Sequence, residues 1–487
     1  MNTRSTTRGL GLLTALAAIS TLTAPVALAA PTPVPAAPSA PSAPTAAKDD
    51  FNGDGYADLV VGVPEGRVAF ADRAGFVTVS YGSKSGLKPS GTKLLTQGGQ
   101  YDTARFGAAL TSADLNRDGY TDLVIGAPGL SWYEDEGGLG ETMVAWGSAQ
   151  GLPDRGHLLA TIDDSGSRLL TADFDGDGNP DLVSVDRSKK NLRVLHGPFD
   201  TAAKPARESS VPMPHGTKEG EWDHFDLQAG DVNGDGIADL VSRYRSVNEK
   251  RRLNVELILW KGAAGGLSPY QKVTDHRRQP IWGDTLAIGD VNNDGRDDIA
   301  VGRTYDSTSG GKVTYIEGTA EGRIGSRNKV FRLDSPRVAG TPERFARFGV
   351  SVSIGDLDGD TYGEIVVGAD GMTLGGKKEA GSVITLPGTK NGPTSTGSEE
   401  LHQNTKGVPG TAEAGDRFGT RTKILDADGD GRGELVVGTP GEDGNRGAIW
   451  VFKTDKNGVT AKGSFALRSD SFDEESGSIQ YGQVYTP

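Results

Sequence analysis

The sequence contains no cysteine, so no disulfide bond can fix any part of its fold. Long amphipathic helical periodicity is also missing, while glycine occurs 71 times. Short apolar runs bounded by glycine, aspartate and asparagine take the place of helical patterns, and they indicate short β-strands joined by turns. Something other than disulfide bonds must therefore hold the loops of this chain in place.

The chain also lacks an excess of basic residues. Its 51 lysines and arginines stand against 65 aspartates and glutamates, which gives a formal net charge of −14. Such a balance provides no electrostatic footprint for nucleic acid, so we expect no nucleic-acid partner. The acidity suits a protein whose carboxylates hold cations, and it is also compatible with a charge that only aids solubility.

A hydrophobic run long enough to cross a bilayer is missing as well. The N-terminal run from Leu10 to Ile19 is only about ten residues long, against the roughly 20 that a spanning helix needs. Arg4 and Arg8 precede it, and the small-residue stretch Ala27 to Ala29 follows it. This pattern predicts a secretory signal peptide over residues 1–29, with an uncleaved anchor as the alternative.

Residues 30–48 consist almost entirely of proline, alanine, serine and threonine. Such a composition cannot bury a core, so we expect an extended, semi-rigid linker. The folded domain is therefore predicted over residues 49–487, and we expect it to be secreted.

A nine-residue motif recurs seven times in this domain. In the copy from Asp114 to Asp122, side-chain oxygens lie at positions 1, 3, 5 and 9, glycine lies at position 6, and position 7 can offer its carbonyl. This is the ligand pattern of a calcium loop, since Ca²⁺ takes six to eight oxygens at about 2.3–2.6 Å. The alternative is a solvated turn, because Asp, Asn and Gly are ordinary turn residues. Seven copies that begin 58 to 70 residues apart, each with an apolar residue at position 2, favour cation binding.

We call the copies the first to seventh loops, at residues 50–58, 114–122, 173–181, 231–239, 290–298, 356–364 and 426–434. The expected metal ligands are the residues at positions 1, 3, 5, 7 and 9: Asp50, Asn52, Asp54, Tyr56, Asp58, Asp114, Asn116, Asp118, Tyr120, Asp122, Asp173, Asp175, Asp177, Asn179, Asp181, Asp231, Asn233, Asp235, Ile237, Asp239, Asp290, Asn292, Asp294, Arg296, Asp298, Asp356, Asp358, Asp360, Tyr362, Glu364, Asp426, Asp428, Asp430, Arg432 and Glu434. Two carboxylates about 4 Å apart repel by roughly 4 kcal/mol at an effective dielectric near 20. We therefore expect up to seven structural Ca²⁺ ions and no other cofactor.

Two features separate these loops from one another and from EF-hands. An EF-hand carries glutamate at position 12 and leads into a helix, whereas position 12 here is apolar, as at Val61 and Ile125, and starts a strand. The sixth loop has Thr361 at position 6, where the backbone turn suits glycine. We expect the sixth loop to bind its cation most weakly.

The repeat of about 60 residues predicts four short strands each time. In the second repeat, Phe106-Gly107 precedes the loop, the apolar run 123–128 follows it, and strands are expected at 141–147 and 157–161. Seven repeats of four strands predict an all-β, seven-bladed β-propeller. The first repeat starts at its loop, while Tyr481-Gly482 repeats the Phe-Gly pair near the far end. We expect residues 478–487 to supply the innermost strand of the first blade, since an unmade strand would leave unpaired edges.

The Phe-Gly and Gly-Ala-Pro pairs around an Asp-rich loop resemble the FG-GAP repeats of the integrin alpha-subunit propeller and its bacterial relatives. The resemblance covers residues 49–487. The first pair recurs as Phe106-Gly107, Trp282-Gly283, Phe348-Gly349 and Phe418-Gly419. The second is complete only at Gly126-Ala127-Pro128, and the third and fourth repeats carry Ser184 and Ser242 in place of its glycine.

The resemblance implies that the cation loops lie on one face and that ligands meet the opposite face. Loops expected on that opposite face carry aromatic residues, namely Tyr101, Trp132, Tyr133, Trp222 and Tyr305. Exposed aromatics there would contact a sugar or protein partner. The alternative is that they pack between blades.

The sequence therefore predicts a monomeric binding or adhesion module for an extracellular protein or glycan, with structural calcium. We expect no enzymatic activity, because the six histidines are scattered and match no catalytic motif. A secreted polysaccharide hydrolase or lyase on the same scaffold is the alternative from another class. A lectin would place the same aromatic on the same loop of several blades, and the loops of this chain differ in length and composition.

Overall fold

The computed structural model describes residues 48–98, 102–129, 139–163, 166–186, 189–214, 226–247, 253–275, 277–306, 310–320, 327–469 and 478–487. The expected signal peptide and the linker up to residue 47 lie outside the described residues. Four aromatics of the expected ligand face also lie outside them: Tyr101, Trp132, Tyr133 and Trp222.

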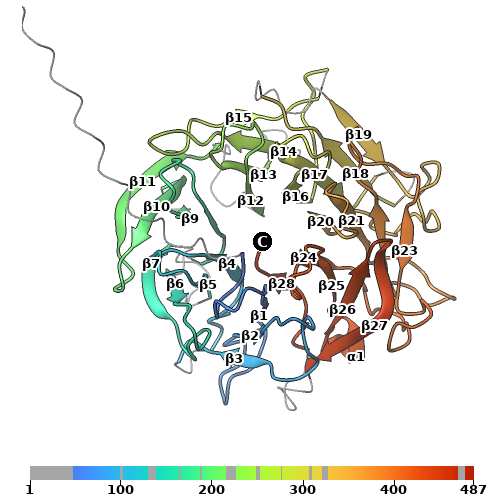
Figure 1. The fold of residues 1–487 in the computed structure, drawn as a ribbon, viewed down its shortest axis with the longest axis horizontal. Helices are drawn as coiled ribbons and strands as arrows, with labels where there is room; N and C mark the ends of the chain where they lie inside the picture. The colour runs from blue at the N-terminus through green and yellow to red at the C-terminus, as the bar shows by residue number, and fades with distance from the viewer. Residues whose placement is uncertain are drawn as a thin grey trace, which may run out of the picture. The chain divides into compact units, whose positions relative to one another are not determined.

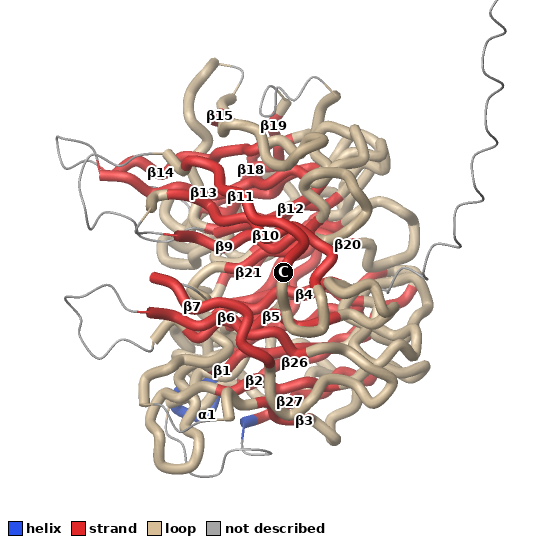
Figure 2. Tube along the Cα trace, turned by 90° about the vertical axis from the view of Figure 1, so that its left-hand side faces the viewer, coloured by secondary structure: helices blue, strands red, loops and turns tan. Residues whose placement is uncertain are grey.

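The described strands form seven four-stranded antiparallel sheets arranged in a ring (Figure 1). The prediction of a seven-bladed β-propeller is confirmed. Seen from the side in Figure 2, the strands run across the ring between two loop-bearing faces.

The blades share one strand order from the centre outward, and they differ mainly in the length of the third and fourth strands. The innermost strands are β28 (Val484–Tyr485), β4 (Ala109–Ala113), β8 (Leu169–Ala172), β12 (Asp226–Gly230), β16 (Thr285–Gly289), β20 (Val352–Gly355) and β24 (Arg421–Leu425). The second strands are β1 (Leu59–Val63), β5 (Asp122–Ala127), β9 (Asp181–Asp186), β13 (Asp239–Val247), β17 (Asp298–Arg303), β21 (Glu364–Ala369) and β25 (Glu434–Thr439). The third strands are β2 (Phe76–Ser80), β6 (Leu139–Ala145), β10 (Asn191–Phe199), β14 (Leu253–Trp260), β18 (Lys312–Ile316), β22 (Ser382–Leu386) and β26 (Ala448–Asp455). The outer strands are β3 (Lys93–Leu95), β7 (His157–Asp163), β11 (Pro205–Pro212), β15 (Gln271–Lys272), β19 (Asn328–Phe331), β23 (Glu399–Leu401) and β27 (Gly458–Arg468).

Counted in this order, the first blade is β28-β1-β2-β3 and the seventh is β24-β25-β26-β27. The described part of the chain contains a single short helix, α1 (Glu442–Asn445). No helix found there is long and apolar enough to cross a membrane.

The second strands are the most deeply buried part of each blade. Every residue of β1, β5, β21 and β25 is buried, because neighbouring blades cover both faces of these strands. One core cluster, for example, joins Val60 and Val77 of the first blade to Leu123 and Ile125 of the second. The core therefore lies between blades, as layers of apolar side chains around the ring.

Glycine allows neighbouring blades to touch. A Cβ added at Gly62 would lie 2.0 Å from the carbonyl oxygen of Gly107, and one added at Gly368 would lie 2.0 Å from that of Gly419. The glycine after the second strand therefore makes room for the aromatic-glycine pair of the next blade. The aromatic ring of that pair is fully buried at Phe106, Phe348, Phe418 and Tyr481.

The fifth blade departs from this arrangement. The fourth blade has Ser242 where five other blades carry the contact glycine, and the third blade has Ser184 there. Trp282 is 42% exposed, while the preceding Ile281 packs in the core. Trp282 therefore does not pack between blades, unlike Phe106 and Phe348 at the equivalent position.

The ring closes as expected, through the C-terminal strand. β28 pairs with β1 in the register Val61 to Tyr485 and Gly62 to Val484. The buried Tyr481 hydroxyl lies 3.1 Å from the Thr78 hydroxyl of the first blade. Figure 1 shows the C-terminus at the centre of the ring.

A buried ion pair ties the closure together. Lys423 Nζ of the seventh blade lies 2.9 Å from Asp49 Oδ2, at the start of the first loop. The same ammonium donates to the carbonyl oxygen of Thr486 at 3.1 Å. Ser112 of the second blade donates to the other oxygen of Asp49. Three blades thus meet at one satisfied charge pair.

The seven inner strands surround a central cavity of about 520 Å³. Hydroxyl groups on these strands mostly bond to the neighbouring blade. Ser353 Oγ lies 2.7 Å from Thr422 Oγ1, and Thr111 Oγ1 lies 2.7 Å from Thr171 Oγ1. The polar inner strands therefore help to hold the ring together.

Candidate metal centres

Each loop wraps its backbone around the carboxylate at position 1. In the first loop, Asp50 Oδ1 accepts the N–H groups of Gly53 and Asp54 at 2.7 and 3.2 Å. Asp50 Oδ2 accepts the N–H of Gly55 at 2.8 Å. Gly53 and Gly55 both take left-handed backbone angles, with φ of 71° and 88°. The turn that brings the oxygens together therefore needs a left-handed residue at positions 4 and 6.

The requirement at position 4 was not visible in the sequence, because non-glycine residues fill it in two loops. Arg117 of the second loop has a φ of 62°, and Asn293 of the fifth has a φ of 54°. At position 6, Thr361 of the sixth loop takes a φ of 75°, as its threonine-for-glycine replacement predicts. A left-handed conformation costs a non-glycine residue about 1–2 kcal/mol.

The carboxylate at position 9 is buried beneath each loop. Asp58 Oδ2 accepts the N–H of Phe51 at 2.9 Å, and its Oδ1 accepts the N–H of Gly82 at 2.8 Å. Gly82 lies just after the third strand, so this carboxylate joins the loop to the middle of the blade. The same bonds recur in the second blade, where Asp122 accepts the N–H groups of Leu115 and Gly147, both at 2.9 Å.

Burial raises the pKa of these position-9 carboxyl groups. It raises the pKa to about 7 for Asp58, Asp122, Asp181, Asp298, Glu364 and Glu434, and to about 6 for Asp239. The neighbouring loop carboxylates shift the pKa in the same direction. A positive charge inside the loop would offset both effects, because it stabilises the ionised carboxylates.

Other loop oxygens also lie close enough together to need a positive charge between them. Oxygens of Asp356, Asp358 and Asp360 lie within 4.8 Å of one another in the sixth loop, and those of Asp426, Asp428 and Glu434 do so in the seventh. Two buried position-3 oxygens, Asn292 Oδ1 and Asp428 Oδ1, have no hydrogen-bond partner. A buried acceptor without a partner costs about 1–3 kcal/mol. Closely spaced oxygens with free lone pairs fit a hard divalent cation.

The loops are joined to one another around the ring. The position-8 N–H of one loop donates to the position-1 carbonyl of the preceding loop, as from Thr121 to Asp50 at 3.0 Å. Equivalent bonds come from Ala57, Ala238, Asp297, Gly363 and Gly433. The third loop has Pro180 at position 8, which carries no N–H, so the bond to Asp114 cannot form.

Position 7 has a second role that the sequence did not reveal. A Cβ added at Gly53 would lie 2.6 Å from Cε1 of Tyr120, the position-7 side chain of the next loop. A Cβ added at Gly176 would lie 2.9 Å from Cδ1 of Ile237 in the same way. The position-7 side chains thus cover the neighbouring loop, which explains why Tyr, Ile and Arg stand there.

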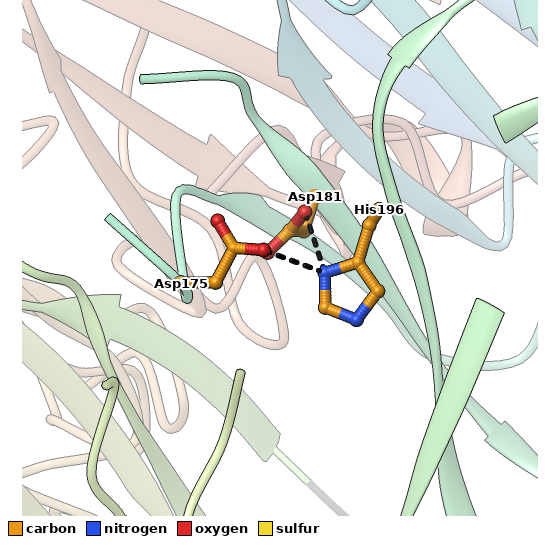
Figure 3. A group of neighbouring side chains, drawn as sticks. All are labelled: Asp175, Asp181 and His196. Carbon is orange, nitrogen blue, oxygen red and sulfur yellow. Dashed lines mark hydrogen bonds and ion pairs between the residues drawn. The ribbon is translucent and has the colours of Figure 1, made fainter. Parts of the chain in front are cut away.

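The carboxylates of the third loop are contacted by side chains from neighbouring strands of the same blade, among them His196 (Figure 3). His196 Nδ1 lies 3.0 Å from Asp181 Oδ1 and 3.3 Å from Asp175 Oδ2. Its Nε2 lies 2.7 Å from Ser209 Oγ. Burial and the Arg207 guanidinium lower the pKa of His196. Its Nδ1 faces carboxylate oxygens, which only accept, so Nδ1 carries a hydrogen and donates. Arg207 Nη2 lies 2.6 Å from Asp175 Oδ2.

The opposite face carries exposed aromatic side chains at the fifth and sixth blades. β17 starts at the cation loop with Asp298, so Arg303 and Tyr305 at its far end lie on the opposite face. Trp282 lies beside them, because Thr285 pairs with Gly302. Tyr305 is 67% exposed and therefore does not pack between blades.

The sixth blade adds Phe345 to this surface. The N–H of Phe348 donates to the carbonyl of Gly310 at 2.8 Å, which holds the two loops together, and Phe345 is 66% exposed. Arg303 lies over the Trp282 ring at 5.4 Å, and Arg344 lies over the Phe345 ring at 5.3 Å. Neither arginine forms an ion pair with a carboxylate within the described ranges. We call Trp282, Arg303, Tyr305, Arg344 and Phe345 the aromatic-arginine surface.

The fold and the loops define a seven-bladed β-propeller with repeated acidic turns. Comparison with protein families places the chain in the FG-GAP repeat family of integrin alpha-like propellers. The FG-GAP repeat model matches residues 42–80, 106–141, 348–386 and 418–452, and the FG-GAP-like repeat model matches residues 173–242 and 231–301. Propellers of this family generally bind divalent cations, and the acidic groups of this chain lie in its loops.

Individual relatives share only part of their length with this chain. Phosphatidylinositol-glycan-specific phospholipase D of Rattus norvegicus is 27% identical over 364 residues, which cover 66% of this chain and 42% of the relative. Integrin alpha-PS2 of Drosophila melanogaster is 31% identical over 226 residues, or 42% of this chain and 15% of that protein. The chain thus spans less than half the length of these relatives. Among solved structures, the Dos1 propeller aligns over 84% of each chain with a TM-score of 0.37 and 10% identity.

Proposed function

We propose that this chain is a secreted, calcium-stabilised binding module that contacts an extracellular protein or glycan through the face opposite its cation loops. The observation that carries this proposal is the aromatic-arginine surface. Large aromatics and arginines are the side chains that most often dominate the binding energy of interfaces. Three such aromatics lie exposed together here, on one face of a rigid ring.

The proposed role of calcium is structural. The loop oxygens come from carboxylates, amides and main-chain carbonyls, which are the ligands that Ca²⁺ prefers over softer metals. In a chain without disulfide bonds, the ions would hold the loop face by binding the native state and not the unfolded chain. Calcium would then keep the blades in register, so that the opposite face stays rigid enough to bind.

An enzymatic role has less support. Phospholipase D activity belongs to a relative of which the matched segment covers 42%, so that activity need not lie in the matched part. The described lining of the central cavity includes arginines, lysines and aspartates but no histidine. We therefore propose a binding function without catalysis.

The test is a binding screen of the full chain in calcium against a glycan array and an array of purified extracellular proteins. The variant Trp282→Ala/Tyr305→Ala/Phe345→Ala should weaken the strongest interaction at least tenfold and leave the melting temperature unchanged. Phe70→Ala is the matched control, because Phe70 is 84% exposed in the first blade. Absence of any ligand for the parent would contradict the binding function, and equal binding by parent and triple variant would contradict the assigned surface.

A further inference from the structure

The third loop differs from the others in what already contacts its ligand oxygens. Arg207 comes from the outer strand β11 and His196 from the third strand β10, and both reach into the turn that precedes β9. Arg207 is half-exposed, whereas His196 and Asp175 are buried. A guanidinium and an imidazole N–H thus contact the same carboxylates that would bind a cation in this loop.

The lone pairs of these oxygens are accounted for. A carboxylate oxygen accepts about two hydrogen bonds. Asp175 Oδ2 receives Arg207 at 2.6 Å and His196 at 3.3 Å. Asp181 Oδ1 receives His196 at 3.0 Å and the N–H of Gly197 at 3.2 Å. Each oxygen therefore already has two donors of the chain directed at it, with the one Nδ1–H of His196 shared between them.

The second loop provides the contrast at position 9. Each oxygen of Asp122 accepts one main-chain N–H, from Gly147 and from Leu115, and keeps a lone pair for a cation. Its burial is the same as that of Asp181, and both carboxylates begin a second strand. The difference thus lies in the partners and not in the depth of the site.

The sixth and seventh loops provide the contrast at position 3. Like the third loop, they carry aspartate there, as Asp358 and Asp428, and hold four carboxylates. In the described structure, neither of these aspartates forms an ion pair with a lysine or arginine. Asp428 Oδ1 has no hydrogen-bond partner at all. Arg207 therefore pairs with the position-3 carboxylate of the third loop, whereas the arginine of the seventh loop, Arg432, pairs with Asp430 at position 5.

We propose that Arg207 and His196 replace calcium in the third loop, so that this loop keeps its conformation without a metal ion. The inference rests on the proposed calcium binding by the remaining loops. It assigns a structural role to two side chains outside the repeated motif. The third blade would then stay ordered in conditions that strip calcium from the others.

The test is hydrogen exchange of the full chain, followed by mass spectrometry of peptides that cover each loop, in calcium and in excess chelator. We expect residues 114–122 and 356–364 to exchange at least tenfold faster in chelator, and residues 173–181 to exchange equally in both. In Arg207→Met, residues 173–181 should become calcium-sensitive. Arg193→Met is the matched control, because Arg193 pairs with Glu208 at 2.7 Å between the same two strands but contacts no loop.

Other results of this hydrogen-exchange experiment would contradict the proposal in distinguishable ways. Calcium-sensitive exchange at residues 173–181 of the parent would overturn the replacement and leave the calcium role of the other loops intact. Exchange that is insensitive to chelator at all seven loops would overturn the proposed calcium role. If residues 173–181 stay insensitive in Arg207→Met and in His196→Asn, the two side chains are not the substitute.

Discussion

The third and sixth loops both depart from the pattern that the other loops share, but by opposite means. The sixth keeps four carboxylates and places Thr361 in a left-handed turn with a φ of 75°, so its backbone is strained. The third keeps glycine at the turn, as Gly178 with a φ of 82°, and fills its ligand oxygens with Arg207 and His196. One loop would bind calcium at a cost, and the other would not require it. A repeated motif can therefore keep its residues and still change what each copy does.

The largest expected effect comes from removing the position-1 carboxylate of the sixth loop in one variant and of the third loop in another. Asp356 and Asp173 each accept three main-chain N–H groups, at 2.7 to 3.2 Å. Asp356→Ala should lose these bonds and the calcium ion, whereas Asp173→Ala should lose the bonds alone. An occupied site adds about 2.7 kcal/mol at a free calcium concentration 100 times its Kd. Thermal melts in calcium and in chelator measure the difference.

In those melts, Asp356→Ala should lose part of the calcium-dependent rise in melting temperature. Asp173→Ala should keep the full rise, although both variants melt below the parent. An equal loss of the calcium-dependent rise in both variants would break the comparison.

A smaller effect is expected from Thr361→Gly, which relieves the left-handed turn of the sixth loop. The gain is partly offset, because the Thr361 hydroxyl accepts a hydrogen bond from Asn293 Nδ2 at 2.8 Å. Relief of about 1–2 kcal/mol less a bond of about 0.5–1.5 kcal/mol leaves an affinity gain of up to about tenfold. Calorimetric titration of calcium measures it. In an Asn293→Ala background the gain should be larger, and an unchanged affinity there would show that the turn is not strained.

The smallest effect is expected from Pro180→Ala, which restores an N–H at position 8 of the third loop. A new bond to the Asp114 carbonyl adds about 0.5–1.5 kcal/mol, and the loss of proline removes about 0.4–1 kcal/mol. The melting temperature should therefore change little, while the new amide becomes protected from exchange. Ala238→Pro is the reciprocal variant, since it removes an existing bond of 3.1 Å to Asp173 and should lower the melting temperature. A rapidly exchanging amide at position 180 would show that the second and third loops are not aligned like the others.

The number of blades, the position of the loops and the closure of the ring were predictable from the sequence. Each depends on a local pattern that repeats: the loop itself, the apolar second strand, and the aromatic-glycine pair that ends at Tyr481. Thr361 was also visible as a strained position, because the strain arises within the nine residues. Repetition supplied the information that a single copy lacked.

Other features depend on contacts between distant segments, and the sequence could not reveal them. His196 and Arg207 lie 15 and 32 residues from the carboxylates they contact, on strands where histidine and arginine are unremarkable. Trp282 stands at the Phe-Gly position, yet its ring is exposed and lies under Arg303, next to a blade that carries Ser242 in place of the contact glycine. Contacts of this kind depend on which strands and blades pack together, so the nine-residue motif does not encode them.

The measurement that tests the account most directly is the number of calcium ions bound per chain at saturation. Equilibrium dialysis of the full chain in buffered calcium, followed by elemental analysis, gives this number. Seven loops less the third predict six ions, of which the one in the sixth loop is lost first as free calcium falls. Seven ions would contradict the replacement by Arg207 and His196, and none would contradict the claim that calcium holds the loop face of this propeller.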